Sequence, residues 1–103
     1  MKTLMILAMA LLASPAWGYK QEDLDKLAAT NTCQECDLAG ADLHLAYLRE
    51  ANLEKAILTG ADLRGTVLTG AVLRDAKIDF ADFTKAKFCN TVMPDGQRIF
   101  KDC

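Results

Sequence analysis

Residues 41–53 have the sequence ADLHLAYLREANL, in which a leucine returns at every fifth position. A large apolar residue keeps this spacing over half of the chain, and a small residue stands two places before each one. Neither the period of about 3.6 residues of an α-helix nor the period of about 2 of a strand produces this pattern. The large residues are Leu38, Leu43, Leu48, Leu53, Leu58, Leu63, Leu68, Leu73, Ile78, Phe83 and Phe88. The small residues are Cys36, Ala41, Ala46, Ala51, Ala56, Ala61, Thr66, Ala71, Ala76, Ala81 and Ala86.

A square coil with sides of five residues makes every fifth residue equivalent. The large residue and the small residue then point inward, and the other three positions of each side face solvent. Successive coils are 20 residues apart in sequence and pair their backbones at about the 4.8 Å spacing of adjacent strands. The sequence therefore predicts an all-β solenoid of the quadrilateral β-helix type.

The runs Ala41-Asp42-Leu43, Ala51-Asn52-Leu53 and Ala61-Asp62-Leu63 resemble the pentapeptide repeat family, whose motif is A-(D/N)-L-x-x. The resemblance covers residues 36–88 and implies a right-handed quadrilateral β-helix, here of about two and two-thirds coils. The flanking segments are also similar to the ends of small exported bacterial members. Some family members mimic duplex DNA and bind topoisomerases, which makes that role one alternative function, although those members are longer and more acidic.

The first 18 residues are typical of a cleaved signal peptide. Lys2 precedes a ten-residue apolar stretch at 4–13, and the small residues Ala16 and Gly18 precede the expected cleavage site. Ten apolar residues are too few to span a bilayer. We therefore expect export to the periplasm or the exterior of a bacterium, with no membrane span after cleavage.

The mature chain divides into three expected parts: a helical cap over 19–32, the β-helix over 33–88 and a capping tail over 89–103. The cap is predicted from Leu24, Leu27 and Ala28, whose spacing places them on one face of a helix.

The tail is expected to cover the other open end of the coil. Pro94 and Gly96 predict a turn that folds Phe100 back over Phe83 and Phe88.

Four cysteines form two pairs, Cys33 with Cys36 and Cys89 with Cys103. The pairs belong to opposite ends of the coil, about 13 Å apart at about 4.8 Å per coil. One zinc ion with ligands at about 2.3 Å cannot bridge that distance. We expect a structural disulfide in each pair, with the first as the more easily reduced bridge because its loop is tiny. A thiol-disulfide protein that uses Cys33 and Cys36 is a second alternative function.

The outward residues include a vertical ladder of Asp42, Asp62 and Asp82, with His44 beside it. These aspartates are expected to accept hydrogen bonds from the backbone at the corners, and whether they also hold a cation is left open. No nucleophile is predicted beside His44, so we expect no catalytic residue, metal or cofactor and no enzyme activity.

The outer surface also predicts an apolar cluster of Leu45, Tyr47 and Val67, which is a candidate contact patch for another protein or for a second copy. The formal net charge of -2 provides no basic footprint for nucleic acid. The sequence therefore favours an exported, non-enzymatic β-helix that acts as a structural or protein-binding module.

Overall fold

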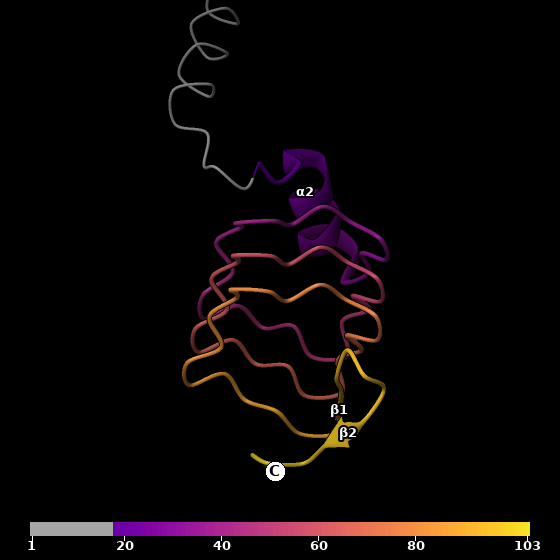
Figure 1. Cartoon of the computed structure of the whole chain (residues 1–103), viewed down its shortest axis with the longest axis vertical. Coiled ribbons are helices and arrows are strands. Elements are labelled where there is room, and N and C mark those ends of the chain that lie inside the picture. Colours follow the sequence, from indigo (N-terminus) through magenta and orange to yellow (C-terminus); the bar gives the residue numbers. More distant parts are fainter. Residues whose placement is uncertain (1–17) are drawn as a thin grey trace, which may run out of the picture.

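The computed structural model describes residues 18–103, so the expected signal peptide lies outside the described residues except for Gly18. Helix α2 (Gln21–Thr30) comes first, a long coil follows, and strands β1 (Thr91–Val92) and β2 (Arg98–Ile99) come last. Figure 1 shows the helix at one end of a stack of coils and the two short strands at the other end. Within the described part, no helix is long and apolar enough to cross a membrane.

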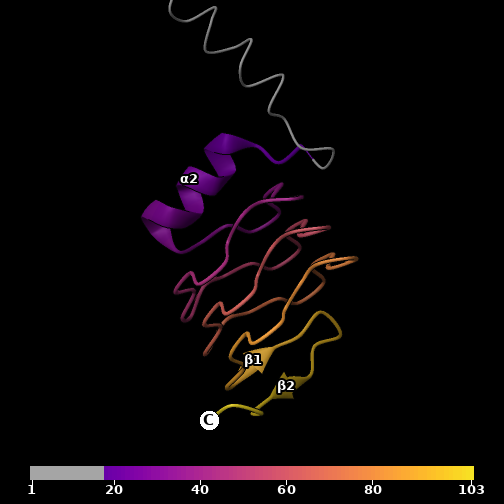
Figure 2. The same cartoon turned by 90° about the vertical axis from the view of Figure 1, so that its left-hand side faces the viewer.

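The coils are joined by parallel bridges between residues that are 20 apart in sequence, as in Asp42 with Asp62 and Asp62 with Asp82. The hydrogen bonds alternate in direction: Leu43 N–H donates to Asp62 O at 2.8 Å, and Asp62 N–H donates to Ala41 O at 2.9 Å. Figure 2 shows the coils stacked one on the next. The chain is thus a quadrilateral coil with the period that the sequence predicts.

The expectation of an all-β chain needs a correction, because little of the coil is regular strand. Each bridge is isolated, and among residues 18–103 only β1 and β2 form strands. The reason is the short side of the square. In the side 41–45, for example, Asp42 makes the bridge, and a turn closes when Ala46 N–H donates to Leu43 O at 3.2 Å.

The turn at each corner places its third residue in the left-handed region. Leu45 has φ 59° and Gly65, one coil further on, has φ 66°. A backbone hydrogen bond across four residues with positive φ at the third is the type II turn, which favours glycine there. Glycine takes this conformation with least strain, and non-glycine residues occupy it at most of the other corners.

The core consists of the two inward columns. Leu53, Leu58, Leu63, Leu68 and Leu73 are 0% exposed, and most alanines of the small column are buried with them. The coil continues past Phe88, where the predicted β-helix ends, because Val72 pairs with Val92. Thr91 and Met93 extend the small and large columns by one step, and Thr91 is fully buried.

Helix α2 covers the first coil, in agreement with the helical cap expected from the sequence. Leu27 is buried at 3% exposure, and Leu24 packs against the core. Asn31 caps the C-terminal end of the helix and has a left-handed backbone conformation. Its backbone N–H donates to Leu27 O, and its side chain donates to Arg49 O at 2.7 Å. The segment before the helix is fixed by Lys20 N–H, which donates to the Asp37 carbonyl at 3.0 Å.

The tail covers the last coil differently from the sequence prediction. Strand β2 pairs antiparallel with β1, Thr91 opposite Ile99, and Ile99 packs against the core. Phe100 is 59% exposed, so the expectation that it covers Phe83 and Phe88 is wrong. Adjacent residues of an extended chain point to opposite sides, and the inward position belongs to Ile99.

Candidate interaction surface

The predicted apolar cluster lies at one corner of the coil. Tyr47 is 80% exposed and Leu45 is 70% exposed, whereas Val67 is half-buried. Tyr47 and Val67 form a parallel bridge, which places their side chains one above the other on the same wall. The structure therefore places Tyr47 and Val67 side by side and Leu45 at the corner that precedes them, and Leu45 and Tyr47 are among the large apolar side chains that remain in water.

Gly65 lies beside Leu45 and makes room for its side chain. A Cβ atom at Gly65 would lie 2.7 Å from Leu45 Cδ2, which is closer than two non-bonded carbon atoms approach one another. The leucine therefore lies against the corner of the next coil, where any residue with a side chain would push it away. This close packing adds apolar surface at the corner that precedes Tyr47 in the chain.

A groove of about 160 Å³ lies on the other side of Tyr47. One wall comes from Leu24 and Ala28 of helix α2 and from Asn31, which caps the helix, and the other wall comes from the first coil with Ala46 and Tyr47. The repeat pattern does not predict this groove, because the groove depends on how α2 crosses the end of the coil. The only sequence signal for it is the apolar stripe on the helix.

The aspartate ladder satisfies backbone and side-chain donors on its own wall. Asp62 accepts Arg64 N–H, and the Arg64 guanidinium donates to both of its oxygens at 2.8 and 2.7 Å. This pairing lowers the pKa of Asp62 from 3.8 to about 2. Asp82 accepts both donors of Thr84, which also lowers its pKa.

Asp42 and His44 form the same arrangement one coil earlier. Asp42 Oδ1 accepts the backbone N–H of His44 and contacts its imidazole Nδ1, and this hydrogen bonding lowers the pKa of the Asp42 carboxyl. Ligand atoms of Asp42, His44 and Asp62 lie within 4.8 Å of one another. A cation at this position would have to displace Arg64 from Asp62, so the cluster does not indicate a metal site.

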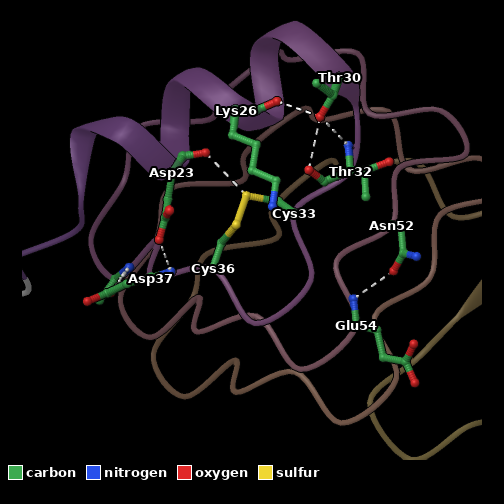
Figure 3. The surroundings of a disulfide bond; sticks show 10 residues. Asp23, Lys26, Thr30, Thr32, Cys33, Cys36, Asp37, Asn52 and Glu54 are labelled. Atoms are coloured by element: carbon green, nitrogen blue, oxygen red, sulfur yellow. Dashed lines mark hydrogen bonds between the residues drawn. A yellow bond between two sulfur atoms is a disulfide. The ribbon is translucent and has the colours of Figure 1, made fainter.

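The first cysteine pair forms a disulfide beneath helix α2 (Figure 3), with an S–S distance of 2.06 Å. Cys33 is 0% exposed and Cys36 is 4% exposed. The Asp23 carbonyl lies 3.2 Å from Cys33 Sγ, and the Asp23 side chain accepts Asp37 N–H at 2.8 Å. A disulfide sulfur carries no proton to donate, so we take the first of these as a van der Waals contact. The helix thus closes over the bridge.

The second pair, Cys89 with Cys103, has an S–S distance of 1.98 Å and lies at the other end. Cys103 is exposed and Cys89 is half-buried. Disulfide exchange requires a thiolate to reach a sulfur atom, so the burial of the first pair opposes its use in thiol-disulfide chemistry. The sequence predicts that Cys33–Cys36 is reduced first, but burial favours the opposite order, because Cys89–Cys103 is the accessible bridge.

Comparison with known proteins gives a family match and structural matches. The model of pentapeptide repeats matches residues 32–65 and 56–93. A pentapeptide repeat protein from the thylakoid lumen of Arabidopsis thaliana has a TM-score of 0.54 and 23% identity, covering 80% of this chain and 49% of that one. HetL, a pentapeptide repeat protein involved in heterocyst differentiation regulation from the cyanobacterium Nostoc sp., has a TM-score of 0.33 and 26% identity, covering 66% and 43%.

This chain therefore spans about half the length of these two solved proteins. No curated protein shows a significant match. The Arabidopsis structure supports the quadrilateral β-helix, and the family model extends over more than half of the chain. The chain belongs to the pentapeptide repeat family.

Proposed function

We propose that the mature chain is an exported, non-enzymatic pentapeptide repeat β-helix that binds another protein chain through the Tyr47 corner. The observation that carries this proposal is the exposure of Tyr47 at the edge of an apolar groove, with Leu45 exposed at the preceding corner. Tyrosine is enriched in protein interfaces because it presents a large rigid apolar area at a low cost in conformational entropy.

Export is supported by the cysteines. Both pairs are at bonding distance, and the described residues contain no free cysteine, which is compatible with an oxidising compartment. The proposal includes a right-handed coil, because the resemblance to the family implies that handedness.

The absence of enzyme activity is supported by the surroundings of the polar side chains. His44 contacts Asp42 and no nucleophile, and Asp62 is held by Arg64. Neither alternative function gains support from the geometry. Cys33 is buried, and the pairing of Arg64 with Asp62 partly neutralises the acidic ladder that a DNA mimic would present.

The test is capture of binding partners by the exported chain under non-reducing conditions, with Tyr47→Glu as the variant. We expect the variant to lose the captured chain, whether a different protein or a second copy, while its thermal unfolding midpoint stays nearly unchanged. Val72→Glu is the matched control, because Val72 is an outward apolar residue on a different wall. Capture that survives Tyr47→Glu, or is lost equally in the control, would overturn the proposal.

A further inference from the structure

We propose that the bound chain is a second copy of this protein, paired side by side and antiparallel across the wall that carries Tyr47, Val67 and Lys87. We call this wall the 47–67–87 wall. In this pair, Phe100 of each copy enters the groove between helix α2 and Tyr47 of the other copy. The inference rests on the proposed function and names its partner.

The groove is suited to a side chain rather than to a small molecule. Its volume of about 160 Å³ is below the range of about 300–1,000 Å³ that is usual for small-molecule sites. Leu24 and Ala28 on the helix and Ala46 on the coil give it apolar walls, and the exposed ring of Tyr47 forms its edge. One large apolar side chain with an aromatic partner at the rim would fit this shape.

Phe100 supplies such a side chain from the opposite end of the molecule. The tail runs back along the edge of the last coil, because Asp102 N–H donates to Phe88 O at 2.8 Å and Cys103 is bonded to Cys89. Phe88 and Cys89 belong to the same side of the square as Tyr47 and Val67, two coils away. Ile99 is opposite Thr91 on the next side, so Phe100 lies at the corner where this wall ends. The groove and the exposed Phe100 therefore lie toward the two ends of one wall.

This placement gives a closed pair under two-fold symmetry. In an isologous interface, residue i of one copy meets residue j of the other, and j meets i. If Val67 lies near the symmetry axis, Tyr47 of one copy is opposite Lys87 of the other, and each groove is opposite Phe100. A lysine ammonium over a tyrosine ring is a favourable cation–π arrangement.

The charges along the molecule favour the antiparallel direction. Residues 18–62 carry nine Asp and Glu against four Lys and Arg, whereas residues 63–103 carry seven Lys and Arg against five Asp and Glu. Helix α2 exposes Glu22 and Asp25 against Lys26, and near Phe100 Arg98 and Lys101 are exposed against Asp102. An antiparallel pair places the acidic half of each copy against the basic half of the other, whereas a parallel pair opposes like charges.

The experiment measures the mass of the exported chain in solution by sedimentation equilibrium up to about 100 μM, with both disulfides intact. We expect a dimer whose dissociation constant rises about tenfold in Phe100→Ala and in Lys87→Glu. Both residues are exposed, so neither substitution should change the thermal midpoint. A second readout is Val67→Cys, which should form a Cys–Cys link between copies, whereas Val72→Cys on another wall should not.

The outcomes separate the two proposals. A monomer at every concentration, with Tyr47-dependent capture of a different protein, overturns the second-copy inference and leaves the proposed function in place. A monomer without any Tyr47-dependent capture overturns both. A dimer that is unaffected by Phe100→Ala and Lys87→Glu, or that links through position 72 instead of 67, overturns the proposed geometry.

Discussion

At its N-terminal end the coil is covered by helix α2, which buries both sulfur atoms of the first disulfide, whereas at its C-terminal end a short tail leaves Cys103 in water. The same difference appears in the core. Leu38 is 0% exposed beneath the helix, but Ile78 and Phe83 in the last coil are only half-buried. A stack of repeats has two unsatisfied ends, and a ten-residue helix covers more area than two strands of two residues.

The comparison indicates that the two ends are stabilised by different kinds of interaction. The N-terminal end relies on apolar packing under α2, with Leu27 buried between helix and coil. The C-terminal end relies more on the covalent link and on Asp102, whose backbone N–H and carboxylate both bond to Phe88. Solution conditions that break disulfides should therefore act on one end first.

The largest effect is expected from truncating the core in the middle of the stack. Leu58 is fully buried and Ile78, its equivalent one coil later, is half-buried. Leu58→Ala should lower the free energy of unfolding by about 3–5 kcal/mol and Ile78→Ala by about 1–2 kcal/mol, because the cost follows the buried contacts that are lost. Urea unfolding of both variants measures the difference. Equal losses would show that the C-terminal end is as well covered as the middle.

The second prediction concerns the disulfides. With limiting reductant on the folded protein, Cys89–Cys103 should be reduced first, since Cys103 is exposed and Cys33 is completely buried. Loss of the second bridge should lower the free energy of unfolding by about 3 kcal/mol, the chain-entropy value for a loop of about 15 residues.

The measurement for this prediction is thiol alkylation followed by mass analysis of each cysteine peptide over time. The double variant Cys89→Ala/Cys103→Ala serves as the matched reference for the energy. Earlier alkylation of Cys33 and Cys36 would contradict the description of α2 as a tight cover over the first bridge.

The sequence predicts the structure best where each side chain repeats with the coil. The leucine and alanine columns and the 20-residue stacking of Tyr47 on Val67 follow from a period that is the same in every coil. The two cysteine pairs were predicted separately, from their places at opposite ends of the coil. The extension to Thr91 and Met93 was present in the sequence but was missed, because methionine differs from the leucine, isoleucine and phenylalanine of the large column.

The ends of the coil were harder to predict, since no repeat governs them. The exposed position of Phe100 depends on the register of β1 with β2, in which Ile99 takes the inward place. The groove beside Tyr47 depends on the angle at which α2 crosses the first coil. Both features result from single contacts between non-repeating segments, and a pattern of hydrophobicity does not specify such contacts.

A smaller effect is expected from the two buried threonines. Thr66 Oγ1 donates to Leu43 O at 2.8 Å, and Thr91 Oγ1 donates to Leu68 O at 2.7 Å, with both side chains 0% exposed. Thr66→Val and Thr91→Val should each cost about 1 kcal/mol, the usual net value of a buried hydrogen bond. Thermal unfolding of the two variants compares the middle of the stack with its last coil. A clearly smaller cost at Thr91 would mean that the last coil opens before the rest.

The smallest effect is expected on the wall between the two ends, at Asp62. Its pKa is lowered from 3.8 to about 2 by the hydrogen-bonded Arg64 guanidinium. The Asp62 carboxylate therefore takes up a proton at a lower pH in the folded state than in the unfolded state. The stabilisation is fully present above about pH 4 and is lost as the pH falls toward about 2. Because Arg64 is 57% exposed, solvent screens the pair and the gain is small.

Asp62→Asn should therefore move the thermal midpoint at pH 7 less than the core and threonine variants do, and the difference from the parent should shrink between pH 4 and pH 2. Asp82→Asn is the control, because Asp82 accepts from Thr84 and has no guanidinium partner. A loss at pH 7 as large as that of Ile78→Ala would mean that the walls contribute as much to stability as the covers at the ends. Added salt should reduce the Asp62 effect and leave the Thr66 effect unchanged, since only the first depends on a charge pair in contact with water.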